Sequence, residues 1–158
     1  MSKQDVLVLF LAACGTTLAV ESLVDQGFPH AGSSRIFGGT IASDVAYPFM
    51  VSVRWYPNHH FCGGTIVNNL WVLTAAHCTI NETTATIFVV FGTNRLDSGG
   101  FSEKIRNIIG HPNFITSRRL NDIAMIQLDY AIRYTSTISP VTLDTTLPQS
   151  IINVTLIG

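Results

Sequence analysis

The sequence predicts a small all-β protein, an antiparallel barrel or sandwich. Of its 158 residues, 47% are hydrophobic and only 12% are charged, with a formal net charge of −1. From residue 36 onward, short β-type runs alternate with turn residues, and no stretch shows convincing helical periodicity. The apolar content excludes an intrinsically disordered chain, and the near-neutral charge argues against nucleic acid as a partner.

The N-terminal segment, residues 1–19, is typical of a secretory signal peptide. Lys3 supplies the positive charge, residues 6–13 (VLVLFLAA) form the apolar core, and small residues follow up to Ala19. The apolar run is too short to span a bilayer, so we expect a secreted, extracellular protein whose mature chain has no membrane anchor. An alternative is a lipoprotein signal in which Cys14 carries the lipid.

The patterned region follows a polar leader at residues 20–35. Spacing of its short apolar runs is typical of a small antiparallel barrel or sandwich. A connector with two prolines is expected at residues 129–150, and a further strand at residues 151–157. Six strands are expected before the connector, at residues 49–55, 61–67, 71–74, 85–92, 103–109 and 123–128.

Three cysteines are an odd number, but Cys14 leaves with the signal peptide and Cys62 and Cys78 remain as a pair. Because secretion takes the chain through an oxidising compartment, we expect a disulfide between these two. The triplets that begin at Asn81 and Asn153 fit the N-glycosylation sequon, which supports secretion weakly.

His77 lies in the segment LTAAHC, directly beside Cys78. A histidine next to a disulfide cysteine is held in place, and imidazole as a chemical group suits a general base that takes a proton near neutral pH and later returns it. The alternative is a partly buried structural histidine.

Asp122 stands at the head of an apolar strand, in the segment NDIAMI. Such an aspartate could accept a hydrogen bond from an imidazole, fix its tautomer and stabilise the imidazolium. The alternative is an Asx turn that opens the strand.

Arg35 and Ile36 lie in the segment SRIFGG, between the leader and the patterned region. Cleavage after Arg35 would create a new ammonium group on Ile36, which could order a site by pairing with a buried carboxylate. The alternative is an exposed Gly-rich loop that happens to contain a basic residue.

Together these features resemble the trypsin/chymotrypsin family of serine proteases, and the ordered set is more specific than any one motif. The resemblance covers Arg35 to Gly158 in the family's order and approximate spacing. Phe37 stands where the family usually has Val. The matching segments are residues 35–39 (RIFGG), 47–52 (YPFMVS), 62–66 (CGGTI), 74–78 (TAAHC) and 122–124 (DIA).

The resemblance implies a double β-barrel with its active site between the barrels. Residues 36–128 would then form the first six-stranded barrel, and residues 129–158 the connector and the first strand of an incomplete second barrel. Residues 20–35 would be an activation peptide, removed by a protease that cuts after Arg35. By the same resemblance His77 is the general base and Asp122 its orienting partner, acting on protein or peptide substrates with no cofactor.

The family's nucleophile is missing from its expected place. It lies in a Gly-Asp-Ser-Gly-Gly segment downstream of the aspartate. Here the similar residues 97–100 (DSGG) precede Asp122 and follow Leu96 rather than glycine. We therefore interpret Ser98 as part of a loop between strands, and not as the nucleophile.

Two functional hypotheses follow from this departure. In the first, the chain is the N-terminal part of a trypsin-like serine endopeptidase zymogen, cut short by an incomplete gene model or truncated transcript, and is inactive alone. In the second, it is a non-catalytic protease homologue that acts as a secreted binding protein. A metal site that combines His59 and His60 with His77 or His111 is not expected, because adjacent histidines on a strand point apart.

Overall fold

The computed structural model describes residues 40–43, 45–144 and 157. The expected signal peptide, the activation peptide with Arg35 and Ile36, and the sequon at Asn153 lie outside the described residues. The described strands all belong to one of the chain's two compact units, Ile41–Thr145.

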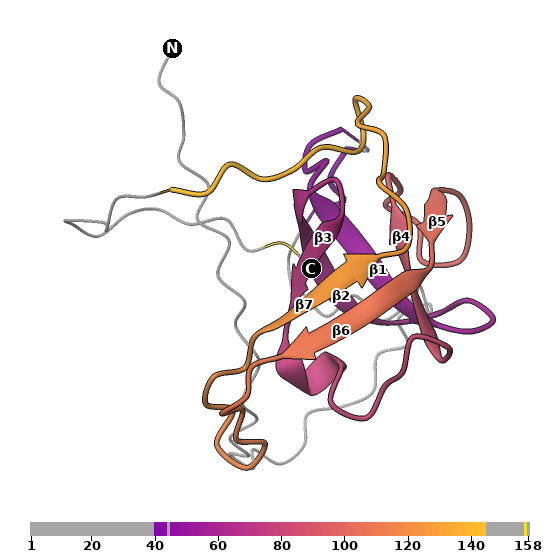
Figure 1. Ribbon diagram of the computed structural model, residues 1–158. Coiled ribbons are helices and arrows are strands. Elements are labelled where there is room, and N and C mark those ends of the chain that lie inside the picture. Colours follow the sequence, from indigo (N-terminus) through magenta and orange to yellow (C-terminus); the bar gives the residue numbers. More distant parts are fainter. Residues whose placement is uncertain (1–39, 44, 145–156, 158) are drawn as a thin grey trace, which may run out of the picture. The chain divides into compact units, whose positions relative to one another are not determined.

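The unit is built on one antiparallel sheet of seven strands, with the order β5-β4-β1-β2-β3-β7-β6 (Figure 1). A single-turn 3₁₀ helix, η1 (Ala76–Cys78), follows β3. This architecture confirms the all-β prediction. The strands are β1 (Met50–Trp55), β2 (His59–Asn68), β3 (Trp71–Thr74), β4 (Ile87–Phe91), β5 (Phe101–Glu103), β6 (Ile105–Gly110) and β7 (Ala124–Leu128).

The sheet curls so that a single residue joins its two edge strands. Strands β5 and β6 occupy opposite edges of the sheet, yet only Lys104 separates them along the chain. A flat sheet would hold its edges many strand spacings apart, so this connection requires a barrel-like curvature.

The strand expected at residues 103–109 is divided in the structure. Glu103 pairs with Val89 of β4, whereas Ile105 pairs with Leu128 of β7. The chain therefore passes from one edge of the sheet to the other at Lys104, and one expected strand becomes two. The difference arises because the curvature of the sheet determines which strand each segment pairs with. A local sequence pattern carries no information about that curvature.

The interior of the curled sheet is filled by aliphatic and aromatic side chains. Strand β7 shows the alternation that this requires: Ala124, Ile126 and Leu128 are buried, and the residues between them are half-buried. Burying such side chains is the main favourable term in folding. The core cluster comprises Val51, Val53, Ile66, Val72, Ile87, Val89, Phe91, Ile105, Ile126, Leu128, Ile132 and Ile138.

The opposite face of β1 carries a buried cation. Arg54 is 1% exposed, and its Nε donates to Ser52 Oγ at 2.8 Å. Its Nη1 and Nη2 donate to Asn58 Oδ1 at 2.8 Å and to the carbonyl oxygen of Arg95 at 2.9 Å. Burial lowers the pKa of Arg54 from its ordinary value, and the charge of Asp97 opposes this shift. The guanidinium therefore fastens the loop after β4 to the outside of β1.

The first part of the expected connector packs on the barrel. Residues 129–144 contain no helix or strand, and Ile132 and Ile138 enter the core. The amide of Ser139 donates to the carbonyl of Pro48 at 2.9 Å. Of the further strand expected at residues 151–157, only Ile157 is described.

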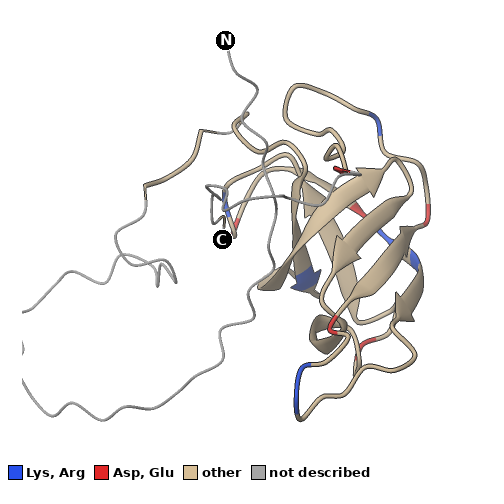
Figure 2. Ribbon diagram, turned by 90° about the vertical axis from the view of Figure 1, so that its left-hand side faces the viewer, with Lys and Arg blue, Asp and Glu red and all other residues tan. Residues whose placement is uncertain are grey.

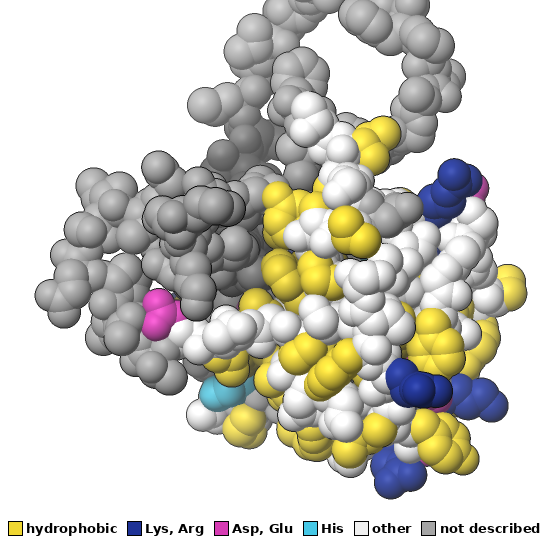
Figure 3. Space-filling model, turned by 90° about the horizontal axis from the view of Figure 1, so that it is seen from above, with side chains coloured by type: hydrophobic (Ala, Val, Ile, Leu, Met, Phe, Trp, Pro, Cys, Tyr) yellow, Lys and Arg dark blue, Asp and Glu magenta, His cyan; other side chains and the backbone are white. Residues whose placement is uncertain are grey.

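Charged residues are few and spread over the barrel, as Figure 2 shows. Hydrophobic side chains are interspersed with polar ones on the face shown in Figure 3. No helix in the described part of the chain is long and apolar enough to cross a membrane.

Candidate active site

The pairing of β3 with β7 brings His77 and Asp122 together. In this antiparallel ladder Thr74 is the partner of Ala124. His77 lies three residues after Thr74, and Asp122 lies two residues before Ala124. Because antiparallel strands place the end of one beside the start of the other, both side chains emerge at the same end of the ladder.

A short helical turn and a disulfide fix the position of His77. The turn η1 is closed by hydrogen bonds from the amides of Cys78 and Thr79 to the carbonyls of Ala75 and Ala76, at 3.1 and 3.0 Å. Cys78 is joined to Cys62 of β2, with the Cα atoms 6.3 Å apart. With a sequence separation of 16, such a crosslink stabilises by about 3 kcal/mol in the chain-entropy model.

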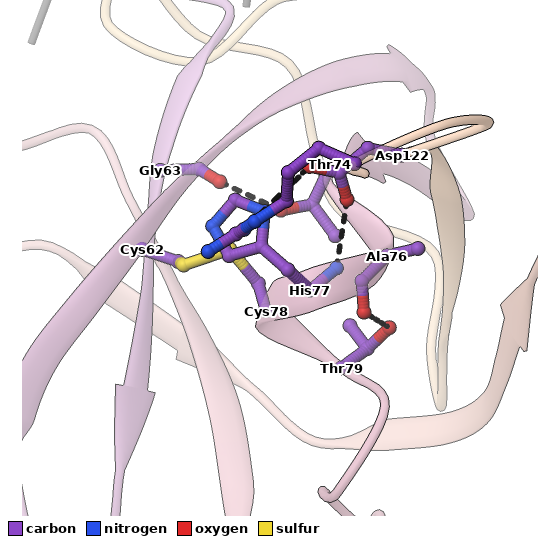
Figure 4. A network of polar contacts seen from close by, with 9 residues as sticks. Cys62, Gly63, Thr74, Ala76, His77, Cys78, Thr79 and Asp122 are labelled. Atoms are coloured by element: carbon purple, nitrogen blue, oxygen red, sulfur yellow. Dashed lines mark hydrogen bonds and ion pairs between the residues drawn. A yellow bond between two sulfur atoms is a disulfide. The ribbon is translucent and has the colours of Figure 1, made fainter. Parts of the chain in front are cut away.

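Asp122 engages His77 with both carboxylate oxygens (Figure 4). The backbone N–H of His77 donates to Oδ1 at 2.8 Å, and the ring Nδ1 bonds Oδ2 at 2.7 Å. A carboxylate can only accept, so Nδ1 carries the ring proton and Nε2 retains its lone pair. The two side chains are 30% and 12% exposed, respectively.

The environment keeps Asp122 ionised. Burial of the carboxyl group raises its pKa, but the backbone and ring hydrogen bonds from His77, with the charges of His77 and Arg119, outweigh burial. The pKa of Asp122 therefore lies below its ordinary value. An ionised carboxylate at this position can orient the imidazole and stabilise it when it becomes protonated.

Arg119 is a neighbour of the pair that the sequence did not indicate. Its Nη1 lies 3.7 Å from Oδ2 of Asp122, and its side chain is 51% exposed. Arg119 and Asn121 both have positive φ, at 51° and 56°. Their left-handed backbone folds the chain back toward Asp122, and no local sequence signal predicts this for Arg.

Other residues singled out in the sequence lie elsewhere. Ser98 is exposed in the loop between β4 and β5, where its Oγ donates to Asp97 Oδ1 at 3.0 Å. His59 stacks on Trp55 with ring centroids 5.6 Å apart, and His60 Nδ1 bonds Ser52 Oγ at 2.8 Å. Asn81 is exposed after η1.

The arrangement can accept a proton, and the residues that the structure describes place no free nucleophile beside it. The Nε2 of His77 can take a proton while Asp122 holds Nδ1–H. In the described part of the chain, the neighbour of Nε2 is Cys78 Sγ at 3.5 Å, a sulfur already engaged in the disulfide.

An antiparallel barrel that presents a hydrogen-bonded His–Asp pair at its strand ends has the arrangement of a serine-protease-type barrel. Comparison with known families agrees: the Trypsin family model matches residues 36–157. The chain is also 29% identical over 145 residues to Trypsin theta of Drosophila melanogaster and to Trypsin delta of Drosophila erecta. The chain therefore belongs to the trypsin family.

The relatives are longer than this chain. Each match covers 92% of the chain but 55% of the relative. The chain thus spans about half the length of the curated relatives it matches.

Proposed function

We propose that the chain supplies the general base and its orienting carboxylate to a trypsin-like serine endopeptidase. The observation that carries this proposal is the double engagement of His77 by Asp122, through the backbone N–H and through Nδ1. The backbone contact fixes the position of His77, and the ring contact fixes which of its two nitrogens carries the proton. Membership of the trypsin family makes a protein or peptide the expected substrate class.

In this proposal His77 takes the proton of a serine hydroxyl at Nε2 as the oxygen attacks the peptide carbonyl, and later gives it to the leaving amine. Asp122 remains ionised and stabilises the transient imidazolium. Support comes from the lowered pKa of Asp122, which keeps the carboxylate charged across the neutral range.

We further propose that these 158 residues form an N-terminal fragment that does not hydrolyse peptide bonds alone. The printed sequence carries no Gly-Asp-Ser-Gly-Gly segment after Asp122, and the serine of DSGG lies in the exposed loop after β4. A base without a nucleophile and without oxyanion donors leaves the largest parts of the rate enhancement unsupplied. The transcript beyond the codon for Gly158 tests the fragment hypothesis directly.

A chimera tests the catalytic assignment. Residues 36–157 would be joined to the second half of Trypsin theta and assayed on a peptide substrate beside the 158-residue chain. We expect hydrolysis by the chimera and none by the chain. His77→Ala should reduce kcat of the chimera by roughly four orders of magnitude or more.

His59→Ala is the matched control for that experiment, because His59 is exposed and stacks on Trp55. It should leave kcat within a factor of two or so, as expected for a surface change. A folded chimera that is inactive, or one that His77→Ala does not impair, would reject the assignment and favour a non-catalytic binding protein.

The processing of the chain is part of the same proposal. Residues 1–19 direct secretion, residues 20–35 form an activation peptide, residues 36–128 form the first barrel, and residues 129–158 begin the second. An activating protease cuts between Arg35 and Ile36. N-terminal sequencing of the secreted and protease-treated protein checks both cleavage positions.

A further inference from the structure

Three potential metal ligands converge at the end of β3. Cys62, His77 and Cys78 each offer one ligand atom, and these atoms lie within 4.8 Å of one another. They form a group of three candidate ligands within the described part of the chain, and Figure 4 shows the imidazole beside the two sulfurs. In the oxidised chain the sulfurs are bonded to each other, so their lone pairs are poor metal ligands.

The spacing between His77 and Cys78 already suits a tetrahedral metal ion. Their Nε2 and Sγ atoms are 3.5 Å apart. For Zn²⁺, bond lengths of about 2.0–2.1 Å to nitrogen and about 2.3 Å to sulfur place two ligand atoms about 3.6 Å apart at the tetrahedral angle. The two sulfurs of a zinc site stand about 3.8 Å apart by the same geometry, so reduction must come first.

Asp122 prepares the imidazole for this role. It holds the proton on Nδ1 and so presents Nε2, with its lone pair, toward Cys78. A carboxylate that accepts from the remote nitrogen of a ligating histidine fixes the tautomer and raises ligand basicity. His77 is 30% exposed, which gives an ion a path from solvent to a site whose Cys78 is buried.

We propose that reduction of the Cys62–Cys78 disulfide converts this group into a Zn²⁺ site with two thiolates, the His77 Nε2 and one water. A dithiol reductant gives two electrons and two protons to the sulfurs and becomes a cyclic disulfide. Binding of Zn²⁺ then displaces one proton from each thiol, leaving two Zn–S bonds and one Zn–N bond. The disulfide and the metal site are mutually exclusive states of the same residues.

The bound ion would also occupy the atom that accepts a proton in the proposed function. A chain holding Zn²⁺ at His77 therefore has no base at Nε2. The metal site itself rests on the described geometry alone and needs no nucleophile, so it stands or falls separately from the endopeptidase proposal.

Cobalt(II) is the probe for this site, because a thiolate ligand produces near-ultraviolet charge-transfer bands and a tetrahedral site produces strong visible bands. The full chain would carry Cys14→Ser, so that only Cys62 and Cys78 provide thiols. We expect no such bands from the oxidised chain and one equivalent of bound Co²⁺ after reduction. Zn²⁺ should displace Co²⁺ and abolish the bands.

Variants that keep both thiols separate a built site from simple thiol binding. His77→Ala should weaken Zn²⁺ binding at least tenfold, and Asp122→Asn should weaken it about 10- to 100-fold. His59→Ala should change the affinity less than twofold. Affinities would be measured by competition with a chromophoric chelator, with circular dichroism to follow the β structure.

Two results would overturn the proposal. One is a reduced chain that gives no thiolate-to-cobalt bands. The other is binding that His77→Ala leaves unchanged, or that the urea-unfolded reduced chain matches, because either shows that two thiols suffice without the folded site.

Discussion

Thr74 and Ala124 face one another in the ladder between β3 and β7, and this pairing sets the separation of His77 and Asp122. His77 and Asp122 are 45 positions apart in sequence, yet Nδ1 of His77 lies 2.7 Å from Oδ2 of Asp122. A shift of one residue in the register would turn the side chains of β7 to the opposite face of the sheet. The buried Ala124, Ile126 and Leu128 oppose such a shift, so core packing maintains the site.

Replacing Asp122 with Asn should move the ring proton of His77. Asn has one acceptor oxygen for the two N–H donors of His77, and its NH₂ group would face Nδ1 if the backbone bond is kept. We expect the proton on Nδ1 in the parent chain and on Nε2 in Asp122→Asn, a difference that ¹⁵N NMR of the imidazole measures. Asp129→Asn, whose carboxylate pairs with Arg106 instead, should leave the His77 signals unchanged.

Acid should destabilise the fold through Asp122. Its pKa is lower in the folded chain than in the unfolded chain, so ionised Asp122 contributes stability above the unfolded pKa of about 3.9. That contribution disappears as the pH falls from about 5 through the lower, folded pKa. Urea unfolding between pH 6 and pH 2 measures the free energy of unfolding, which should fall less steeply with acid in Asp122→Asn than in the parent. Equal pH dependence in the two chains would contradict this expectation.

Arg54 should stabilise the loop after β4. Arg54→Met leaves Ser52 Oγ, Asn58 Oδ1 and a loop carbonyl without their charged donor, and should cost about 2–3 kcal/mol. Arg54→Lys keeps the charge but loses the planar arrangement of donors, and should cost less.

Urea denaturation measures the free energy of unfolding of these variants. Arg118 is exposed, so Arg118→Met is the control, and its stability should stay within about 0.5 kcal/mol of the parent. If Arg54→Met were as stable as the parent, the hydrogen bonds would only offset the burial of the guanidinium.

Three glycines should respond to alanine in a fixed order. Gly100 has φ +80°, and a Cβ there would lie 2.6 Å from the carbonyl oxygen of Phe91, so Gly100→Ala combines backbone strain with a clash. Gly99 has φ +70° and its nearest contact would be at 3.3 Å, so Gly99→Ala should cost about 1 kcal/mol. Gly110 has nothing within 4 Å and serves as the control. Thermal unfolding should show the largest loss of stability for Gly100→Ala, a smaller loss for Gly99→Ala and the smallest for Gly110→Ala. Any other order would contradict the loop geometry.

Glycosylation should occur at Asn81 when the chain is secreted from eukaryotic cells. Asn81 is exposed, which leaves its amide accessible to the modifying enzyme. Mass spectrometry of Asn81→Gln should show one glycan fewer than the parent, and Asn153→Gln tests the second sequon. An unchanged mass in Asn81→Gln would show that this sequon is not used.

Most of the strands could be predicted from local pattern. Runs of about four to eight residues rich in β-branched and aromatic side chains, bounded by turn residues, are typical of β-strands. This pattern located β1, β2, β3, β4 and β7 to within two residues at each end. The division at Lys104 could not be predicted, because it depends on Glu103 and Ile105 having partners at opposite edges of the curled sheet. The burial of Arg54 was missed for a similar reason: its hydrogen-bond partners include the carbonyl of Arg95, far along the chain.

Local sequence alone accounts for three features: a composition typical of a β protein, the position of His77 beside a cysteine, and the family resemblance carried by the segments around His77 and Asp122. The contacts of the site come from the folded chain: both carboxylate oxygens of Asp122 bond His77, Arg119 lies beside that carboxylate, and Cys78 Sγ lies near Nε2 of His77. The catalytic roles of His77 and Asp122 stay predictions. The physical reason for the division is that strand propensity and residue chemistry are local, whereas register, curvature and left-handed backbone at a loop depend on contacts between distant parts of the chain.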